Sequence, residues 1–427
     1  MTKYVYLIIG IIITVSQFAI AAPEETHDPS NDLLREIVRE RVLVNNLELK
    51  ALEWDIQSKE ALVRQSKTWK NPEFEVEAEN VLGTGTNKGF DNAETTYKFS
   101  EEFELWGKRG MRFQSSKLEL ALSKNRYRQF KLNLLKSLDS LFAQVVSAQE
   151  KVDFAKEKVQ LNEALITEIK RLVKAGRFSS VEEKRARIRL SKSRLTEKIL
   201  EKELLILKYQ LSLLWGDEFH LFKAAMKTEF NPEKEDTTSL NVLKEQLASS
   251  PEMERLQMEK QVVNLHLKAD KSEALPNPTL FGGIKDYQGD RSQTWVLGAA
   301  FPIPIFDRNV GHISSAKANL EKKNKEIHAA KLSLSLQLTD LFYQKNLTIT
   351  HLVSFKTMLI PDAQDVYNDV RQGYLKGRYS YLDLFDAQDS LFEIKENYAE
   401  AVADFHRIGA EIWALIGNEV QLKGKTL

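Results

Sequence analysis

Two groups of carboxylates have a spacing that could do chemistry. From residue 73 to residue 79, glutamates alternate with apolar side chains, which is the period of a strand with one acidic and one apolar face. Asp383 and Asp386 are three residues apart and would share one face of a helix. Carboxylates gathered around a symmetry axis repel one another, hold cations and raise their own pKa values. The alternative for the two aspartates is a pair of solvated carboxylates on a surface helix. The acidic face of the strand would carry Glu73, Glu75, Glu77 and Glu79.

The side chains that most enzymes use are absent or scattered. The chain has 427 residues and no cysteine, and its seven histidines show no ligand-like spacing. It has neither a nucleophile elbow nor a glycine-rich phosphate loop. We therefore expect no catalytic residues, no metal site, no cofactor and no enzyme activity. Lys and Arg together number 61, as do Asp and Glu, and this balance argues against a nucleic-acid partner.

The N-terminus has the layout of a secretory signal peptide. A basic start is followed by a nearly continuous apolar run from Tyr4 to Ile20 and by the small-residue site Ala19-Ile20-Ala21. We expect residues 1–21 to be removed and residues 22–31 to form an N-terminal tail. The alternative is a retained anchor, since about 17 apolar residues lie at the lower limit for a spanning helix. No later stretch approaches that length, so the exported chain is either soluble or a β-barrel protein.

The chain is built twice. Residues 174–179 (KAGRFS) recur as residues 375–380 (LKGRYS), and three other short matches occur in the same order. Four ordered matches indicate an internal duplication. We assign residues 32–239 to the first repeat, residues 240–417 to the second, and residues 418–427 to a C-terminal tail.

Each repeat is expected to fold as helix, hairpin, long helix, turn and return helix, which makes the fold α+β and mostly α. Residues 108–214 contain no proline, and Gly176 marks the turn between two helices, as Gly377 does in the second repeat. The first repeat would contain a helix over 32–67, a hairpin over 73–105, a long helix over 108–174, a return helix over 180–214 and an equatorial segment over 217–239. The second would contain a helix over 240–271, a hairpin over 279–303, a long helix over 311–374 and a return helix over 380–415.

The long helix of the first repeat carries a coiled-coil seam. Apolar residues recur at alternating intervals of three and four, interrupted by Asn162, and this spacing favours supercoiling against a partner helix. In the second repeat, Pro361 lies inside the long helix and should bend it, because proline lacks a backbone donor. The seam by itself also fits a periplasmic coiled-coil scaffold without a pore. The seam residues are Leu138, Leu141, Val145, Ala148, Val152, Ala155, Val159, Ile166, Ile169 and Val173.

The four strands have the length of membrane-spanning barrel strands. Each has about 9 to 11 residues, which crosses a bilayer when the strand is tilted. Aromatic residues lie near the strand ends, as interfacial girdles require. Four strands cannot close a barrel, and lipid offers no partner for an open edge. Two copies of the chain would give 8 strands, which side chains would fill, whereas three would give 12 and leave a lumen. Closure therefore predicts an oligomer and favours a trimer.

The order of these elements resembles the TolC-like outer-membrane efflux channels, most nearly their CzcC/CusC-like heavy-metal branch. The resemblance covers about residues 32–417. Four motifs carry it: Leu275-Pro276-Asn277-Pro278, Glu104-Leu105-Trp106-Gly107-Lys108-Arg109, Phe301-Pro302-Ile303-Pro304-Ile305-Phe306-Asp307-Arg308-Asn309, and the stretch from Gly373 to Asp386.

The resemblance implies a homotrimer in the outer membrane of a Gram-negative bacterium. A 12-stranded β-barrel would cross the lipid, and long antiparallel coiled-coil helices would form a periplasmic α-barrel tunnel. The tunnel would dock to a periplasmic adaptor protein and to an inner-membrane pump of the RND type. The family has no catalytic activity.

The resemblance also implies roles for residues at the periplasmic tip. Tyr374, Asp383 and Asp386 match the aperture tyrosine and the two acidic ring positions of the family. The aperture arginine of the family stands one place from Arg378, which we include in the expected gate, and Tyr379 occupies the matching position.

The two turns after the long helices would form the adaptor-docking tip. This tip contains Gly176 and Arg177 in the first repeat and Gly377 and Tyr379 in the second. At the other end of the molecule, the apolar face of the hairpins would meet lipid. The four glutamates from Glu73 to Glu79 would then face the barrel lumen.

The leading function is a passive exit duct in a tripartite efflux pump, with heavy-metal cations among the candidate substrates. The outer-membrane duct of a type I protein secretion system has the same architecture and stays an alternative. His, Met and Cys side chains form no soft-ligand track in the sequence, so metal selectivity would reside in the pump.

Overall fold

The structure is a computed structural model, and it describes residues 32–217, 222–225 and 238–418. The expected signal peptide (1–21), the N-terminal tail (22–31) and all but the first residue of the C-terminal tail (418–427) lie outside the described residues. Most of the expected equatorial segment (217–239) lies outside them too.

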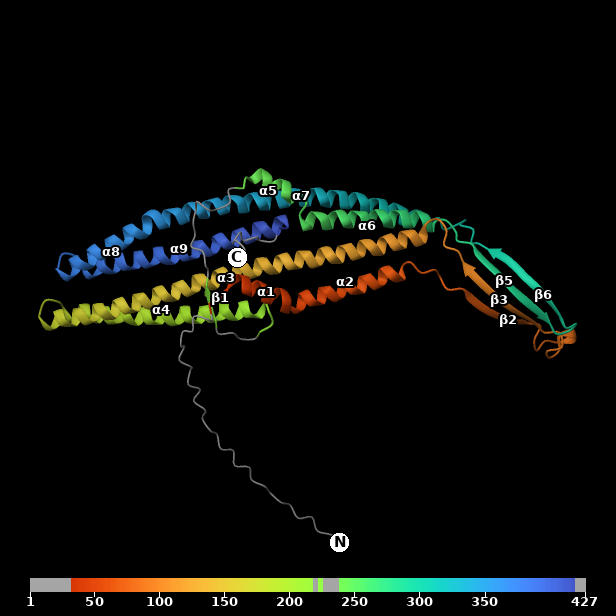
Figure 1. The fold of residues 1–427 in the computed structure, drawn as a ribbon, viewed down its shortest axis with the longest axis horizontal. Helices are drawn as coiled ribbons and strands as arrows, with labels where there is room; N and C mark the ends of the chain where they lie inside the picture. Colours follow the sequence, from red (N-terminus) through yellow and green to blue (C-terminus); the bar gives the residue numbers. More distant parts are fainter. Residues whose placement is uncertain (1–31, 218–221, 226–237, 419–427) are drawn as a thin grey trace, which may run out of the picture.

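The first repeat contains two short helices, a hairpin and a pair of long helices (Figure 1). A three-residue strand pairs its N-terminal end with a strand near its C-terminal end, in parallel. In chain order the elements are β1 (Asp32–Leu34), α1 (Arg35–Asn45), α2 (Leu47–Gln65), β2 (Glu73–Glu79), the 3₁₀ turn η2 (Gly85–Asn87), β3 (Glu94–Glu102), α3 (Lys108–Lys174), α4 (Ser180–Leu213) and β4 (Lys223–Ala225).

The second repeat follows the same order of helix, hairpin and long helices. Its long helix is divided by a short π-helical segment. Its elements are α5 (Leu240–Leu247), α6 (Pro251–Glu273), β5 (Thr279–Tyr287), β6 (Ser292–Ala300), α7 (Val310–Ser354), η4 (Phe355–Leu359), α8 (Ile360–Leu375) and α9 (Tyr381–Ile416).

The two hairpins form one antiparallel sheet at one end of the molecule, in the order β2-β3-β5-β6 (Figure 1). β3 pairs with β5 from Glu94 opposite Tyr287 to Glu102 opposite Thr279, so the sheet joins the two repeats. β2 and β6 form the two edges of this sheet. The expected hairpins extend beyond the observed strands, since residues 103–105 and 301–303 belong to the connections to α3 and α7.

The long helices extend from the sheet to the opposite end of the molecule, where both helical hairpins turn (Figure 1). α3 has 67 residues over the expected bounds, which corresponds to roughly 100 Å. α3 packs along both α4 and α9, and α9 packs along α7 and α8. In the half of the molecule that ends in the two turns, the helices therefore lie in the order α4, α3, α9, α8.

The two shorter helices were expected to be continuous, and this was wrong. The first breaks at Asn46, whose side-chain oxygen accepts a hydrogen bond from the Leu49 N–H and caps α2. The second breaks before Ser250, whose hydroxyl accepts from the Met253 N–H, with Pro251 as the first residue of α6. A side-chain cap satisfies the free donors of a new helix, so each short polar residue supports a second helix start.

A bend was expected at Pro361, and the structure shows a π-helical segment immediately before the proline. The Ile360 N–H donates to the Phe355 carbonyl, so the helix widens into the π-segment η4. Proline cannot donate to the preceding turn, and the widened turn accommodates the missing bond.

Most of the coiled-coil seam of α3 is buried. Leu138, Val145, Val152 and Ile169 are each at most 4 % exposed. Apolar clusters lie at mid-length and at the tip, where α3, α4, α8 and α9 meet. Within the described residues, no helix combines the length and apolar character needed to cross a membrane.

Candidate channel surfaces

The four-stranded sheet has one polar face and one apolar face. The strand register places the glutamates of β2 opposite alternate residues of β3, so Glu75 faces Lys98 and Glu77 faces Thr96. The next strand continues this face with Lys285, which stands opposite Thr96. The four glutamates expected on one face therefore do share it, together with lysines from β3 and β5.

Ion pairs partly neutralise the acidic face. Lys98 Nζ lies 2.6 Å from a Glu75 carboxylate oxygen, and Lys285 Nζ lies 2.6 Å from a Glu79 oxygen. Lys285 also pairs with Glu94 of β3. No pattern in the sequence indicates these pairs, because cross-strand neighbours depend on which strands pair and in which register.

The opposite face of the sheet is largely apolar, and its large apolar side chains are exposed. Trp295 and Leu297 of β6 are 77 % and 79 % exposed, which is unusual for side chains of this size in a folded chain. The same face carries Phe74 and Val76 of β2, Tyr97 and Phe99 of β3, and Leu280 and Ile284 of β5, all exposed. A two-faced sheet with its apolar side outward has the pattern of barrel strands in a membrane.

At the other end of the molecule, the two helical hairpins turn in the same way. Gly176 and Gly377 have φ angles of 70° and 73°, in the left-handed region that side chains with a Cβ disfavour. Both turns are Schellman motifs, which satisfy the last carbonyls of the preceding helix. The closing bonds run from the Arg177 N–H to the Leu172 oxygen at 2.9 Å and from the Arg378 N–H to the Gly373 oxygen at 2.8 Å.

Asp383 belongs to the cap of α9. Its carboxylate accepts a hydrogen bond from the Ser380 backbone N–H at 2.7 Å, and the Ser380 hydroxyl accepts from the Asp383 N–H at 3.2 Å. This is a capping box. The bond from the Ser380 N–H lowers the pKa of Asp383, whereas carboxylate repulsion was expected to raise it. Within one chain, the cap therefore favours the ionised carboxylate of this residue. Asp386 is exposed one turn farther along and has no such bond in the described structure.

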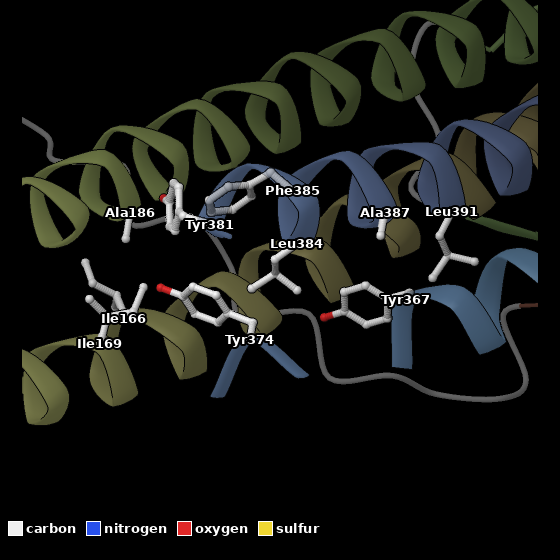
Figure 2. Packing of buried hydrophobic residues seen from close by; sticks show 10 residues of the cluster. All are labelled: Ile166, Ile169, Ala186, Tyr367, Tyr374, Tyr381, Leu384, Phe385, Ala387 and Leu391. Carbon is white, nitrogen blue, oxygen red and sulfur yellow. The ribbon is translucent and has the colours of Figure 1, made fainter. Parts of the chain in front are cut away.

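Tyr374 lies in the core of the tip. Its side chain is 2 % exposed, and its ring packs 5.2 Å from Phe178 and 6.2 Å from Tyr381, measured between ring centroids. Figure 2 shows the ring between Ile169 of α3 and Leu384 of α9. The hydroxyl has no hydrogen-bond partner among the described residues, and burial raises its pKa. In this conformation Tyr374 holds the four helices together, and an aperture role for it stays a prediction.

The remaining tip residues lie on the surface. Arg177 and Arg378 are exposed, and neither side chain forms an ion pair with a described residue. The ring of Tyr379 covers the backbone of Gly373, where a Cβ would stand 2.3 Å from the ring. The structure therefore brings the two turns to one end of the molecule and separates Asp383 and Asp386, on the surface, from Tyr374, in the core.

Known proteins are similar to this chain over most of its length. A family profile described as "Outer membrane efflux protein" matches residues 38–217 and 242–418. The cobalt-zinc-cadmium resistance protein CzcC of Cupriavidus metallidurans is 25 % identical over 375 residues, which is 87 % of each chain. The nickel-cobalt-cadmium resistance protein NccC of Alcaligenes xylosoxydans xylosoxydans is 23 % identical over 281 residues, which is 64 % of this chain and 63 % of that protein.

The fold agrees with solved structures of such proteins. A crystal structure of CusC, described in connection with transmembrane channel formation, superposes with a TM-score of 0.79 at 16 % identity. The match covers 94 % of this chain and 96 % of CusC. The expected resemblance to TolC-like channels and their heavy-metal branch is therefore confirmed. The profile matches both repeats over most of their length, and the chain belongs to the outer membrane efflux protein family.

Proposed function

We propose that this protein is the outer-membrane exit duct of a tripartite efflux pump and that three copies form one channel. The observation that carries the proposal is the two-faced sheet with two open edges, β2 and β6. An open edge in lipid leaves backbone groups without partners, so the edges of neighbouring copies must pair. Three copies give a 12-stranded barrel, with the apolar face toward outer-membrane lipid and the glutamate face toward the lumen.

The helices would form the periplasmic tunnel below this barrel. A rod of roughly 100 Å reaches far from the membrane, and the turns at Gly176 and Gly377 lie at its distant end. We assign docking of a periplasmic adaptor to the exposed residues of these turns, including Arg177 and Tyr379. An inner-membrane pump of the RND type would deliver substrate to the tunnel. The tunnel itself performs no chemistry.

Divalent heavy-metal cations are the substrate class that we favour. Two relatives are named for resistance to cobalt, zinc, nickel or cadmium. The polar face of the sheet carries more glutamates than lysines. Among the described residues, Glu73 and Glu77 have no ion pair, so their charges are not neutralised. A lumen of net negative charge raises the local concentration of cations. Specificity for one metal would still come from the pump.

The proposal is tested by deleting the gene and measuring growth and cell-associated metal in cobalt, zinc, cadmium and nickel. We expect the deletion strain to accumulate metal and the intact gene to restore resistance. A second test uses a chain with Gly176 and Gly377 replaced by valine. This chain should still insert in the membrane but should fail to restore resistance, because its docking turns are strained.

Two outcomes would redirect the proposal. Unchanged metal content together with loss of a secreted polypeptide would favour a type I secretion duct. Recovery of the mature protein as a soluble periplasmic monomer would favour the coiled-coil scaffold and would contradict a channel.

A further inference from the structure

The helical part of the chain has two lateral edges that no described element covers. α4 packs against α3 and, near the tip, also contacts α9 through Arg189 and Asp389, and α8 packs against α9. The outer sides of α4 and α8 have no described neighbour (Figure 1). Each edge exposes large apolar residues along its length, and those of α4 recur at intervals of seven and four. On α4 these are Val181, Ile188, Leu195, Ile199, Ile206 and Leu213; on α7, η4 and α8 they are Leu332, Leu336, Tyr343, Leu347, Met358 and Val366.

The two edges carry opposite charge. On α4, Lys184 and Lys192 flank Ile188 on the face turned away from α3. On α8, Asp362 and Asp369 flank Val366 on the face turned away from α9. None of these four charged side chains forms an ion pair or a hydrogen bond with a described residue.

The two turns are level within one chain. Lys395 follows Gly377 at almost the same sequence distance as Glu157 precedes Gly176. The side chains of Lys395 and Glu157 form an ion pair at 3.3 Å between α9 and α3, so these two positions lie side by side. Equal sequence distances from the two turns therefore correspond to nearly equal heights along the helices, because every helical residue adds the same rise.

At equal heights, the charges of the two edges match. Lys184 and Asp369 are equally distant in sequence from the glycines of their respective turns. Lys192 and Asp362 lie farther from the tip, and their distances from the two glycines are again nearly equal. Each lysine of the α4 edge therefore has an aspartate of the α8 edge at its own level.

The apolar residues of the two edges match in the same way. Ile188 and Val366 lie at nearly equal sequence distances from the glycines of their turns, between the two levels of charge. Farther from the tip, Leu195 is level with Met358 by the same measure. Ile206 and Leu347, farther still, are also equally distant from their turns.

A closed ring requires this kind of match. Rotation about an axis parallel to the helices does not shift one copy along that axis, so neighbouring copies touch at equal heights. We infer that α4 of one copy packs on α8 and α7 of the next, with Lys184 opposite Asp369 and Lys192 opposite Asp362. This inference rests on the proposed ring-shaped channel and identifies the surfaces that close its tunnel.

The charges select which edges meet. Contact of α4 with a second α4 would place lysine against lysine, and contact of two α8 helices would place aspartate against aspartate. Like charges disfavour both twofold arrangements, whereas the mixed contact joins each copy head to tail. The apolar residues between the charges then exclude water and stabilise the contact. The ion pairs therefore direct assembly toward a ring.

Charge reversal tests the inference. We would make K184E/K192E, D362K/D369K and the four-residue variant that combines them, and compare heat-modifiable oligomers after detergent extraction. We expect each double variant to lose oligomer by roughly tenfold or more, equivalent to at least about 1.4 kcal/mol. The four-residue variant should restore it, because its edges are again complementary. The matched control is K170E/K174E on α3, which changes the same charge near the same end and should leave the oligomer intact.

Mixing the two double variants provides a further test. In a ring with an even number of copies they can alternate, so every contact becomes complementary. A ring of three always retains one mismatched contact, so co-expression should restore oligomer poorly. Full restoration by co-expression would support the edge pairing and contradict the trimer of the proposed function. A wild-type trimer that both double variants leave intact, or that the four-residue variant fails to restore, would overturn the edge pairing alone.

Discussion

The Asn162 side-chain nitrogen donates a hydrogen bond to the Ser193 hydroxyl across the α3–α4 coiled coil, with 2.8 Å between the two atoms. Both residues are buried, at 2 % and 6 % exposure. This pair explains the one interruption in the apolar seam of α3. A buried polar pair fixes which residues of two helices face each other, because any slip leaves its atoms without partners.

The pair leads to a prediction on stability. Ser193→Ala should destabilise the folded chain by about 1–3 kcal/mol, because the buried Asn162 nitrogen then has no partner. Replacing both residues by apolar ones, as N162L/S193A, should cost less than the single change. Thermal unfolding followed by helical circular dichroism measures both. If the double variant were the less stable of the two, the hydrogen bond would not be the reason for the polar pair.

A second prediction concerns the two glycine turns. Valine at position 176 or 377 would have to adopt a left-handed backbone, at a cost of about 1–2 kcal/mol per residue. We expect G176V and G377V to weaken metal resistance at unchanged protein level. Gly110→Ala is the control, because Gly110 lies inside α3 with open space around it and should tolerate a Cβ. Full resistance in both valine variants would show that the turns are not the docking tip.

A third prediction separates the two tip aspartates. Asp386→Asn should raise single-channel conductance and weaken block by a trivalent cation, because it removes charge without touching the cap of α9. Asp383→Asn should in addition loosen the start of α9, since an amide is a poorer partner for the Ser380 N–H than a carboxylate. Conductance in planar bilayers and hydrogen exchange at the tip distinguish the two. Unchanged block in D386N would place the acidic ring elsewhere.

A fourth prediction concerns pH. Burial lowers the pKa of His406 to about 4 from its ordinary value of 6.5, with Arg35 and Lys345 as further causes. The unfolded chain therefore binds more protons between pH 6.5 and pH 4, so stability falls as the pH falls through that window, by at most roughly 3 kcal/mol.

The test for His406 is a pair of unfolding curves at pH 7 and pH 5. We expect wild type to lose stability at pH 5 and His406→Gln to lose clearly less. His351→Gln serves as the control, because His351 is exposed on α7. Equal losses in wild type and H406Q would mean that another group senses the acid.

A fifth prediction concerns the barrel lumen. Lys98 and Lys285 each pair with glutamates of the polar sheet face. K98Q/K285Q should therefore strengthen the preference for cations, and E75Q/E79Q should weaken it. The reversal potential in a salt gradient reports this preference. Asp286→Asn on the opposite face is the control, and an effect of that change equal to the others would argue against the assigned lumen face.

Local patterns determined much of this protein. The alternation from Glu73 to Glu79 is enough to predict a two-faced strand, since successive side chains of a strand point to opposite faces. The long helix was predicted at its observed bounds, because a proline-free span of good helix formers between two breakers has few other conformations. The glycine at each turn follows from the same local rule, because the Schellman motif needs a positive φ.

Only the tertiary structure decided which residues share a surface. The apolar spacing of α8 includes Tyr374, but only the convergence of four helices decides that its ring packs against Phe178 of the first repeat. The pairing of Lys98 with Glu75 depends on the strand register, and the hydrogen bond from Asn162 to Ser193 depends on the alignment of two helices. Local sequence fixes backbone conformation over a few residues. Contacts between distant segments depend on the packing of the whole chain, because burial and hydrogen bonding are satisfied collectively.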